Sequence, residues 1–173
     1  MKPPNLLLIF FLSWFQIVVA SDSEVILSKF DRYIDLKSSR NDAAPDDVAS
    51  YTVKIKKVRS ELIEYGNQGV DVLLSEMASN PSSRRKTDII LFLDQGNLVN
   101  GKILSAVKKM ALSQELDNLN PSVLIRSIDY LGNHGTQADI QLLESFNNHN
   151  SQGIPILVKL AIQRINKRGR GEM

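Results

Sequence analysis

The chain has 173 residues, with 21 lysines and arginines against 19 aspartates and glutamates, two histidines and no cysteine. Its length is about that of one domain, and a formal net charge of +2 gives no whole-molecule field of the kind that nucleic-acid binding relies on, so we expect no nucleic-acid partner. A sequence without cysteine excludes a disulfide framework, a thiolate nucleophile and a cysteine-based zinc site.

The first 20 residues have the layout of a secretory signal peptide. Lys2 precedes an almost unbroken apolar run over residues 6–19, and small residues end the segment at Ala20. An uncleaved membrane anchor is the alternative, but this run is shorter than the roughly 20 apolar residues that a bilayer span needs. The pattern predicts a signal peptide over residues 1–20, a secreted or periplasmic protein, and no integral membrane span after processing.

Prolines recur at nearly regular intervals in the rest of the chain. Proline suits the first turn of a helix, because its missing N–H group has no intrahelical partner there. Four prolines, spaced by 36, 40 and 34 residues, each open a segment of helical periodicity: Pro45, Pro81, Pro121 and Pro155. We expect Asn80 and Asn120 to be the N-caps of two of these helices.

Gly-Asn pairs mark a second position in each unit. Glycine ends a helix at little cost because it adopts the left-handed backbone conformation, which asparagine also tolerates. Three pairs each follow one apolar helical stretch and precede another: Gly66-Asn67, Gly96-Asn97 and Gly132-Asn133. Each unit is therefore predicted to contain a proline, a first helix, a Gly-Asn turn and a second helix.

Apolar residues recur at steps of three and four, which places them on one side of each helix. A stripe of this kind in a first helix is Val48, Tyr51, Ile55, Val58, Leu62 and Tyr65, and one in a second helix is Val99, Ile103, Ala106, Val107 and Met110. Thr136 and Asp139 resemble a capping box at the start of a later helix. Residues 24–37 predict one more helix, followed by a polar loop at 38–44. No segment alternates with period two, so no sheet is expected.

These features resemble those of the HEAT-like or armadillo-like helical repeats, in which antiparallel helix pairs stack into a curved solenoid. The resemblance covers Pro45 to Lys167 and implies an all-α fold, a right-handed alpha-alpha superhelix (a short HEAT-like solenoid) of about seven to eight helices. We expect a signal peptide at 1–20, an N-terminal capping helix and loop at 21–44, HEAT-like helical repeats at 45–168 and a basic disordered tail at 169–173. An irregular helical bundle is the structural alternative.

Residues that could carry chemistry are scattered along the sequence. His134 and His149 have no further zinc ligands at local spacing, so we expect both to be solvent-exposed turn residues. Turn and helix-end geometry explains the remaining candidates, which are Gly66-x-x-Gly69, Gly132-x-x-Gly135 and the pair Asp46 and Asp47. No serine elbow or catalytic triad is recognisable in the sequence. We therefore expect a non-enzymatic protein with no catalytic, cofactor-binding or metal site.

Basic residues gather in four short segments, 54–59, 84–86, 102–109 and 164–170. A solvated helix face explains most of them. Lys102 and Lys109, however, fall about 20° apart on a helical wheel, beside the apolar stripe of their helix. We expect these two lysines to contact a protein or peptide partner, as a rim of charge beside an apolar groove. The resemblance implies that this helix lines the concave side of the stack.

The leading hypothesis is an exported, non-enzymatic helical-repeat protein that acts as a protein- or peptide-binding scaffold. Two alternatives remain open. One is a small lyase-like enzyme of the HEAT-like repeat class, because some helical-repeat proteins of this shape act on tetrapyrroles. The other is a salt-dependent binder of an anionic polymer or membrane surface, acting through Lys159 to Arg170.

Overall fold

The computed structural model describes residues 6–114 and 121–171, with side chains described for 22–113 and 121–171. Within these residues the secondary structure is entirely helical, which confirms the all-α class. The α-helices are α1 (Leu6–Asn41), α2 (Val48–Glu64), α3 (Gly66–Ser79), α4 (Ser83–Gln95), α5 (Gly101–Gln114), α6 (Ser122–His134), α7 (Ile140–Ser145) and α8 (Gly153–Gly169), with short 3-10 turns at Gln137–Asp139 and Phe146–Asn148.

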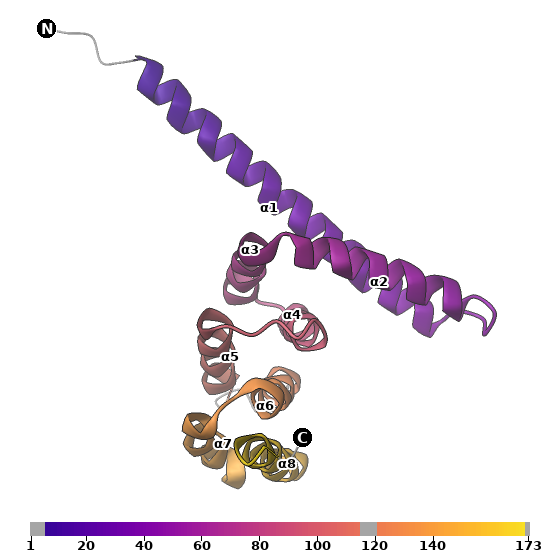
Figure 1. The fold of residues 1–173 in the computed structure, drawn as a ribbon, viewed down its shortest axis with the longest axis vertical. Coiled ribbons are helices and arrows are strands. Elements are labelled where there is room, and N and C mark those ends of the chain that lie inside the picture. Colours follow the sequence, from indigo (N-terminus) through magenta and orange to yellow (C-terminus); the bar gives the residue numbers. More distant parts are fainter. Residues whose placement is uncertain (1–5, 115–120, 172–173) are drawn as a thin grey trace, which may run out of the picture. The chain divides into compact units, whose positions relative to one another are not determined.

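The chain divides into two compact units, Met1–Leu73 and Leu74–Met173, with the division inside α3. In the first unit, α1 and α2 pack against each other as an antiparallel pair (Figure 1). Ile26, Phe30 and Tyr33 follow helical spacing on α1 and are buried, as are Val58 and Leu62 on α2. Full burial of a side chain of this size contributes about 1.5–3 kcal/mol, so this stripe holds the pair together.

A polar contact adds to that apolar packing. Lys29 of α1 forms an ion pair with Glu61 of α2. The hydrogen bond between them raises the pKa of Lys29 and lowers the pKa of Glu61.

The helix predicted at 24–37 is present, but it is longer than predicted, because α1 continues into the expected loop as far as Asn41. It also runs without a break from Leu6 past Ala20.

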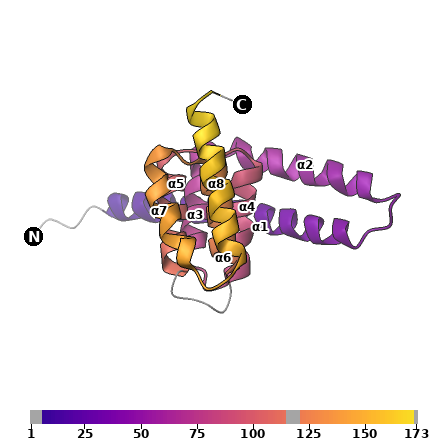
Figure 2. The same ribbon diagram turned by 90° about the horizontal axis from the view of Figure 1, so that it is seen from below.

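The second unit has two layers of helices. α4, α6 and α8 lie side by side in one layer, and α5 and α7 lie on one side of it (Figures 1 and 2). α6 is the central helix, in contact with α4, α5 and α8, while α7 contacts α8. The buried residues of α6 accordingly occupy most of its circumference: Val123, Leu124, Ser127, Ile128, Tyr130, Leu131 and Gly132. The stacking of antiparallel helix pairs and the right-handed superhelix remain predictions.

The predicted Gly-Asn turns form at two of the three positions. Gly66, the first residue of α3, has φ +54° and breaks the helix after α2, and Asn97 has φ 51° after α4. At the third position the prediction is wrong, because Gly132 and Asn133 lie inside α6, which continues to His134. A β-carbon built on Gly132 would lie 2.8 Å from the β-carbon of Ala161 in α8. Glycine is needed here for the close approach of two helices, and the chain leaves the helix at Gly135 instead.

The helix starts differ in part from the predicted caps. Ser82, not Asn80, caps α4: its hydroxyl accepts a hydrogen bond from the Arg85 N–H at 3.3 Å, while the side chain of Asn80 accepts one from the Ser82 N–H at 2.9 Å. Asn120 lies outside the described residues. The capping box of Thr136 and Asp139 is confirmed. An unpredicted cap is Asn100, whose side chain accepts a hydrogen bond from the Ile103 N–H at 2.9 Å.

The C-terminal end of the second unit is the helix α8. It ends at Gly169, and the N–H of Arg170 still donates to the carbonyls of Asn166 and Lys167. Helical structure therefore extends one residue into the segment predicted as a disordered tail from residue 169. Residues 172–173 of that predicted tail lie outside the described residues.

Candidate functional site

Lys102 and Lys109 lie on the outer side of α5, and both are exposed. Two further exposed residues, Ser105 and Leu112, continue the same line at steps of three and four. We call these four residues the α5 stripe. Leu112 is 49% exposed, which gives the stripe one large apolar side chain beside its lysines.

The apolar residues predicted beside these lysines do not form the expected groove. Ile103, Val107 and Met110 are buried in the unit instead of lining a surface. Val99 precedes α5 and is 44% exposed. The exposed residues of the α5 stripe are therefore its two lysines, Ser105 and Leu112.

The neighbouring Lys108 has an internal role. It forms an ion pair with Asp139, which is buried at the start of α7. The Asp139 carboxylate also accepts hydrogen bonds from the N–H of Thr136 at 2.7 Å and from its hydroxyl at 3.2 Å. Burial by itself would raise the pKa of Asp139, but the hydrogen bonds from Lys108 and Thr136 outweigh it and lower the pKa. This cluster joins α5 to the turn before α7.

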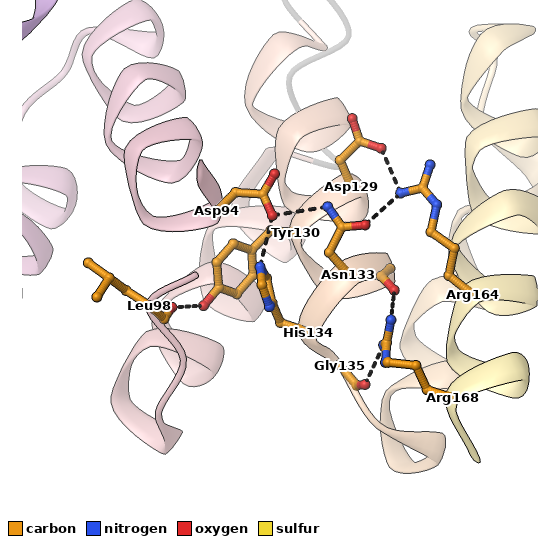
Figure 3. A network of polar contacts seen from close by, with 10 residues as sticks. Asp94, Leu98, Asp129, Tyr130, Asn133, His134, Gly135, Arg164 and Arg168 are labelled. Atoms are coloured by element: carbon orange, nitrogen blue, oxygen red, sulfur yellow. Dashed lines mark hydrogen bonds and ion pairs between the residues drawn. The ribbon is translucent and has the colours of Figure 1, made fainter. Parts of the chain in front are cut away.

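A larger polar network connects α4, α6 and α8 (Figure 3). At its α4 end, one carboxylate oxygen of Asp94 is 2.9 Å from the Nε2 atom of His134 and accepts a hydrogen bond from the Asn133 side chain at 3.0 Å. The His134 side chain is only 10% exposed. The expectation that His134 is a solvent-exposed turn residue is therefore wrong, because the helix continues through it and brings it against α4.

Tyr130 lies next to this pair, one turn before His134 on α6. Its ring centroid is 4.6 Å from that of His134, and its hydroxyl donates a 2.6 Å hydrogen bond to the carbonyl oxygen of Leu98. Burial, with a smaller contribution from the charge of Asp94, raises the pKa of the Tyr130 hydroxyl. The tyrosine is thus a neutral hydrogen-bond donor that fixes the connection between α4 and α5.

Two arginines of α8 form the other end of the network (Figure 3). Arg164 donates to Asp129 at 3.3 Å and to the side-chain oxygen of Asn133 at 3.0 Å. Arg168 donates to two carbonyl oxygens near the end of α6, those of Gly132 at 2.7 Å and Gly135 at 2.8 Å. Burial, and then the nearby charge of Arg164, lower the pKa of Arg168. Two positively charged residues of the C-terminal basic segment are therefore bound to α6 and to the residue that follows it.

The second histidine is half-buried, so the expectation that it is solvent-exposed is also wrong. The Nδ1 atom of His149 accepts a hydrogen bond from the Ser151 N–H at 3.1 Å, whereas its Nε2 atom is buried without a partner. The expected position of His149 in a turn is correct, because it follows the 3-10 turn Phe146–Asn148.

Several other observations bear on binding chemistry. Across the described residues, no three histidine, aspartate or glutamate side chains are grouped so that they could hold a metal ion. The same part of the chain contains no helix that is both long enough and apolar enough to cross a bilayer. Asp46 and Asp47, which precede α2, are exposed.

The polar side chains of this network thus bind to other helices and turns. Asp94, His134, Arg164 and Arg168 are half-buried, and each forms a hydrogen bond with a group on a neighbouring element. Of these residues, sequence reasoning singled out His134 and placed the two arginines in a basic segment, but it did not identify Asp94, the partner of His134 on α4.

No protein-family model, curated protein or solved structure matches this chain. The functional inference below therefore depends on the residues themselves.

Proposed function

We propose that the chain is an exported, non-enzymatic helical scaffold that binds a protein or peptide partner through the α5 stripe. The observation that carries the proposal is the division of polar residues in the second unit. Potentially reactive groups such as His134 and Asp94 are used to hold helices together, whereas Lys109 and Leu112 of the α5 stripe are exposed.

The composition of the stripe favours a protein partner. An exposed leucine can supply a small apolar contact, and the lysines beside it favour acidic groups at the edge of that contact. Regular helix packing supports the proposal as well, because α5 is held on its inner side by Ile103, Val107 and Met110 and keeps its outer side available. A rigid helix presents such side chains with little loss of entropy on binding.

The experiment that tests the proposal is capture of envelope proteins on the immobilised chain, compared with a Lys109→Glu/Leu112→Ser variant. We expect a protein that the wild-type chain retains to be lost from this variant. The matched control is Lys56→Glu/Val53→Ser on α2, where both residues are also exposed, and it should retain the partner. Equal retention by both variants, or no specific capture by the wild-type chain, would contradict the proposal.

A further inference from the structure

Two exposed helix faces, one in each unit, have opposite charge. On α1, Glu24, Ser28, Asp31 and Asp35 are exposed and follow one another at steps of four, three and four. At 100° per residue they lie within about 60° of each other, opposite the buried line through Ile26 and Phe30. We call these four residues the acidic stripe.

The outer face of α8 is basic and apolar. Ile156, Leu160, Gln163 and Lys167 are exposed and repeat at the same steps of four, three and four, with Lys159 beside them. Ile156 is 62% exposed and Leu160 is 42% exposed. Arg164 and Arg168 point to α6, and α8 contains no acidic residue, so the charge of this outer face is entirely positive. We call these five residues the α8 stripe.

An apolar feature accompanies the acidic stripe. Val25 is 45% exposed at its edge, and an open hollow of about 420 Å³ is lined by Glu24, Val25, Ser28 and Lys29. A branched apolar side chain of the size of Ile156 or Leu160 fits such a hollow, and its burial against Val25 would remove apolar surface of both from water.

We propose that the α8 stripe of one copy binds the acidic stripe of a second copy of this chain. Lys159 and Lys167 then face Glu24 and Asp35 of the other molecule, and Ile156 and Leu160 cover Val25. Along the helix axes the two lysines are about 12 Å apart and the two carboxylates about 16 Å, at 1.5 Å per residue, a difference that flexible lysine side chains can bridge.

The charges also select the arrangement. Two α8 stripes facing each other would oppose lysines to lysines, and two acidic stripes would oppose carboxylates to carboxylates, both of which are unfavourable. The contact is therefore heterologous, with different surfaces on the two molecules. Contacts of this kind extend into open chains, or close into rings when the rotation between molecules allows it.

Sedimentation of the full chain tests this proposal, measured up to about 1 mM because a contact of this small size is weak. The average mass should rise with concentration, and the rise should be lost in about 1 M NaCl, where the Debye length is about 3 Å. The wild-type chain and all variants carry the same N-terminal segment, so any contribution of that segment to the average mass is equal in every comparison.

Charge reversal makes the test specific. Lys159→Glu/Lys167→Glu and Glu24→Lys/Asp35→Lys should each associate at least tenfold more weakly than the wild-type chain. An equimolar mixture of these two variants should associate again, because each then offers a face complementary to the other. The matched control is Lys56→Glu/Arg84→Glu, at two exposed positions outside both stripes, and it should behave as wild type.

Circular dichroism establishes that each variant remains helical. A wild-type chain that stays monomeric to about 1 mM overturns the proposal. So do reversed variants that associate as strongly as the control, or a mixture that is no heavier than its components. Partner capture by the α5 stripe uses other residues, so either proposal can fail without the other.

Discussion

At the scale of single residues, the contact that a polar side chain makes with a neighbouring helix or turn decides its role. Lys108 and Lys109 are neighbours in the sequence, yet Lys108 pairs with the buried Asp139 and Lys109 is exposed. Two Gly-Asn pairs that look alike in the sequence also differ: Gly66 takes a left-handed conformation at the start of a helix, whereas Gly132 packs inside a helix against α8. Substitution of such residues therefore separates structural positions from surface positions.

Replacement of Gly132 by valine tests the close approach of α6 and α8. A β-carbon at Gly132 would meet both the Cβ of Ala161, at 2.8 Å, and its Cα, at 2.9 Å, so the helices must separate. We expect Gly132→Val to lower the free energy of unfolding by about 1–3 kcal/mol or more, measured with urea. Gly101→Val is the control, because no atom lies within 4 Å of the new β-carbon, and the change should be within about 0.5 kcal/mol. Equal stability of the two variants would contradict the packing.

The lowered pKa of Asp139 predicts a pH dependence of stability. A carboxyl whose pKa is lower in the folded state than in the unfolded state contributes stability above its unfolded pKa, and this contribution is lost as the pH falls through the folded value. The ordinary value for this group is 3.8, so the loss occurs below about pH 4. Asp139→Asn should thus be less stable than wild type at pH 7, and the difference should shrink at about pH 3. Urea unfolding at the two pH values measures it, and a difference independent of pH would contradict the role of the carboxylate charge.

At the scale of helices, the contacts between α6 and α8 explain why the C-terminal basic segment is only partly a surface. Arg168 satisfies carbonyl groups at the end of α6, where the helix has no further N–H donors of its own. A chain that stops after Asn166 would therefore lose a structural contact together with its surface charge. Weaker binding of an anionic polymer by such a truncated chain would not by itself identify a binding site.

Single substitutions separate the two effects. Arg168→Gln removes the paired hydrogen bonds to Gly132 and Gly135 and should lower the free energy of unfolding by about 1–3 kcal/mol. Lys167→Gln, at an exposed neighbouring position, should leave it within about 0.5 kcal/mol of wild type. Thermal or urea unfolding makes the comparison. If both variants lose the same stability, the arginine is not the link between these helices.

At the scale of the whole molecule, the predicted signal peptide can be removed without loss of the described core of the first unit. The first buried apolar residue described on α1 is Ile26, which follows the predicted cleavage site after Ala20. The sequence contains a single tryptophan, Trp14, and it lies within the predicted signal peptide.

Processing therefore has two direct signatures. N-terminal sequencing of the protein recovered outside the cytoplasm should begin at Ser21, and its fluorescence should show no tryptophan emission. Retention of Trp14 in the exported form, or recovery of the intact chain in the cytoplasm alone, would contradict the proposed export.

Much of the fold was predictable because its signals are local. Proline positions, three-and-four spacing and the capping box of Thr136 and Asp139 each depend on residues within one helix or turn, and they locate helices and one cap correctly. The candidate site was less predictable. His134 looks like a turn residue until its partner Asp94 is known, and the two are 40 residues apart. A glycine that permits close packing also looks the same in the sequence as one that permits a left-handed turn.

A double-mutant cycle on Asp94 and His134 tests most directly whether the polar network holds α4 against α6. The free energy of unfolding is measured for the wild-type chain, Asp94→Ala, His134→Ala and the double variant. We predict a coupling of about 0.5–3 kcal/mol, because either single change already removes the 2.9 Å contact. Losses that add to within about 0.3 kcal/mol would mean that the pair does not stabilise the fold, and would contradict the division between structural and surface residues from which the function is inferred.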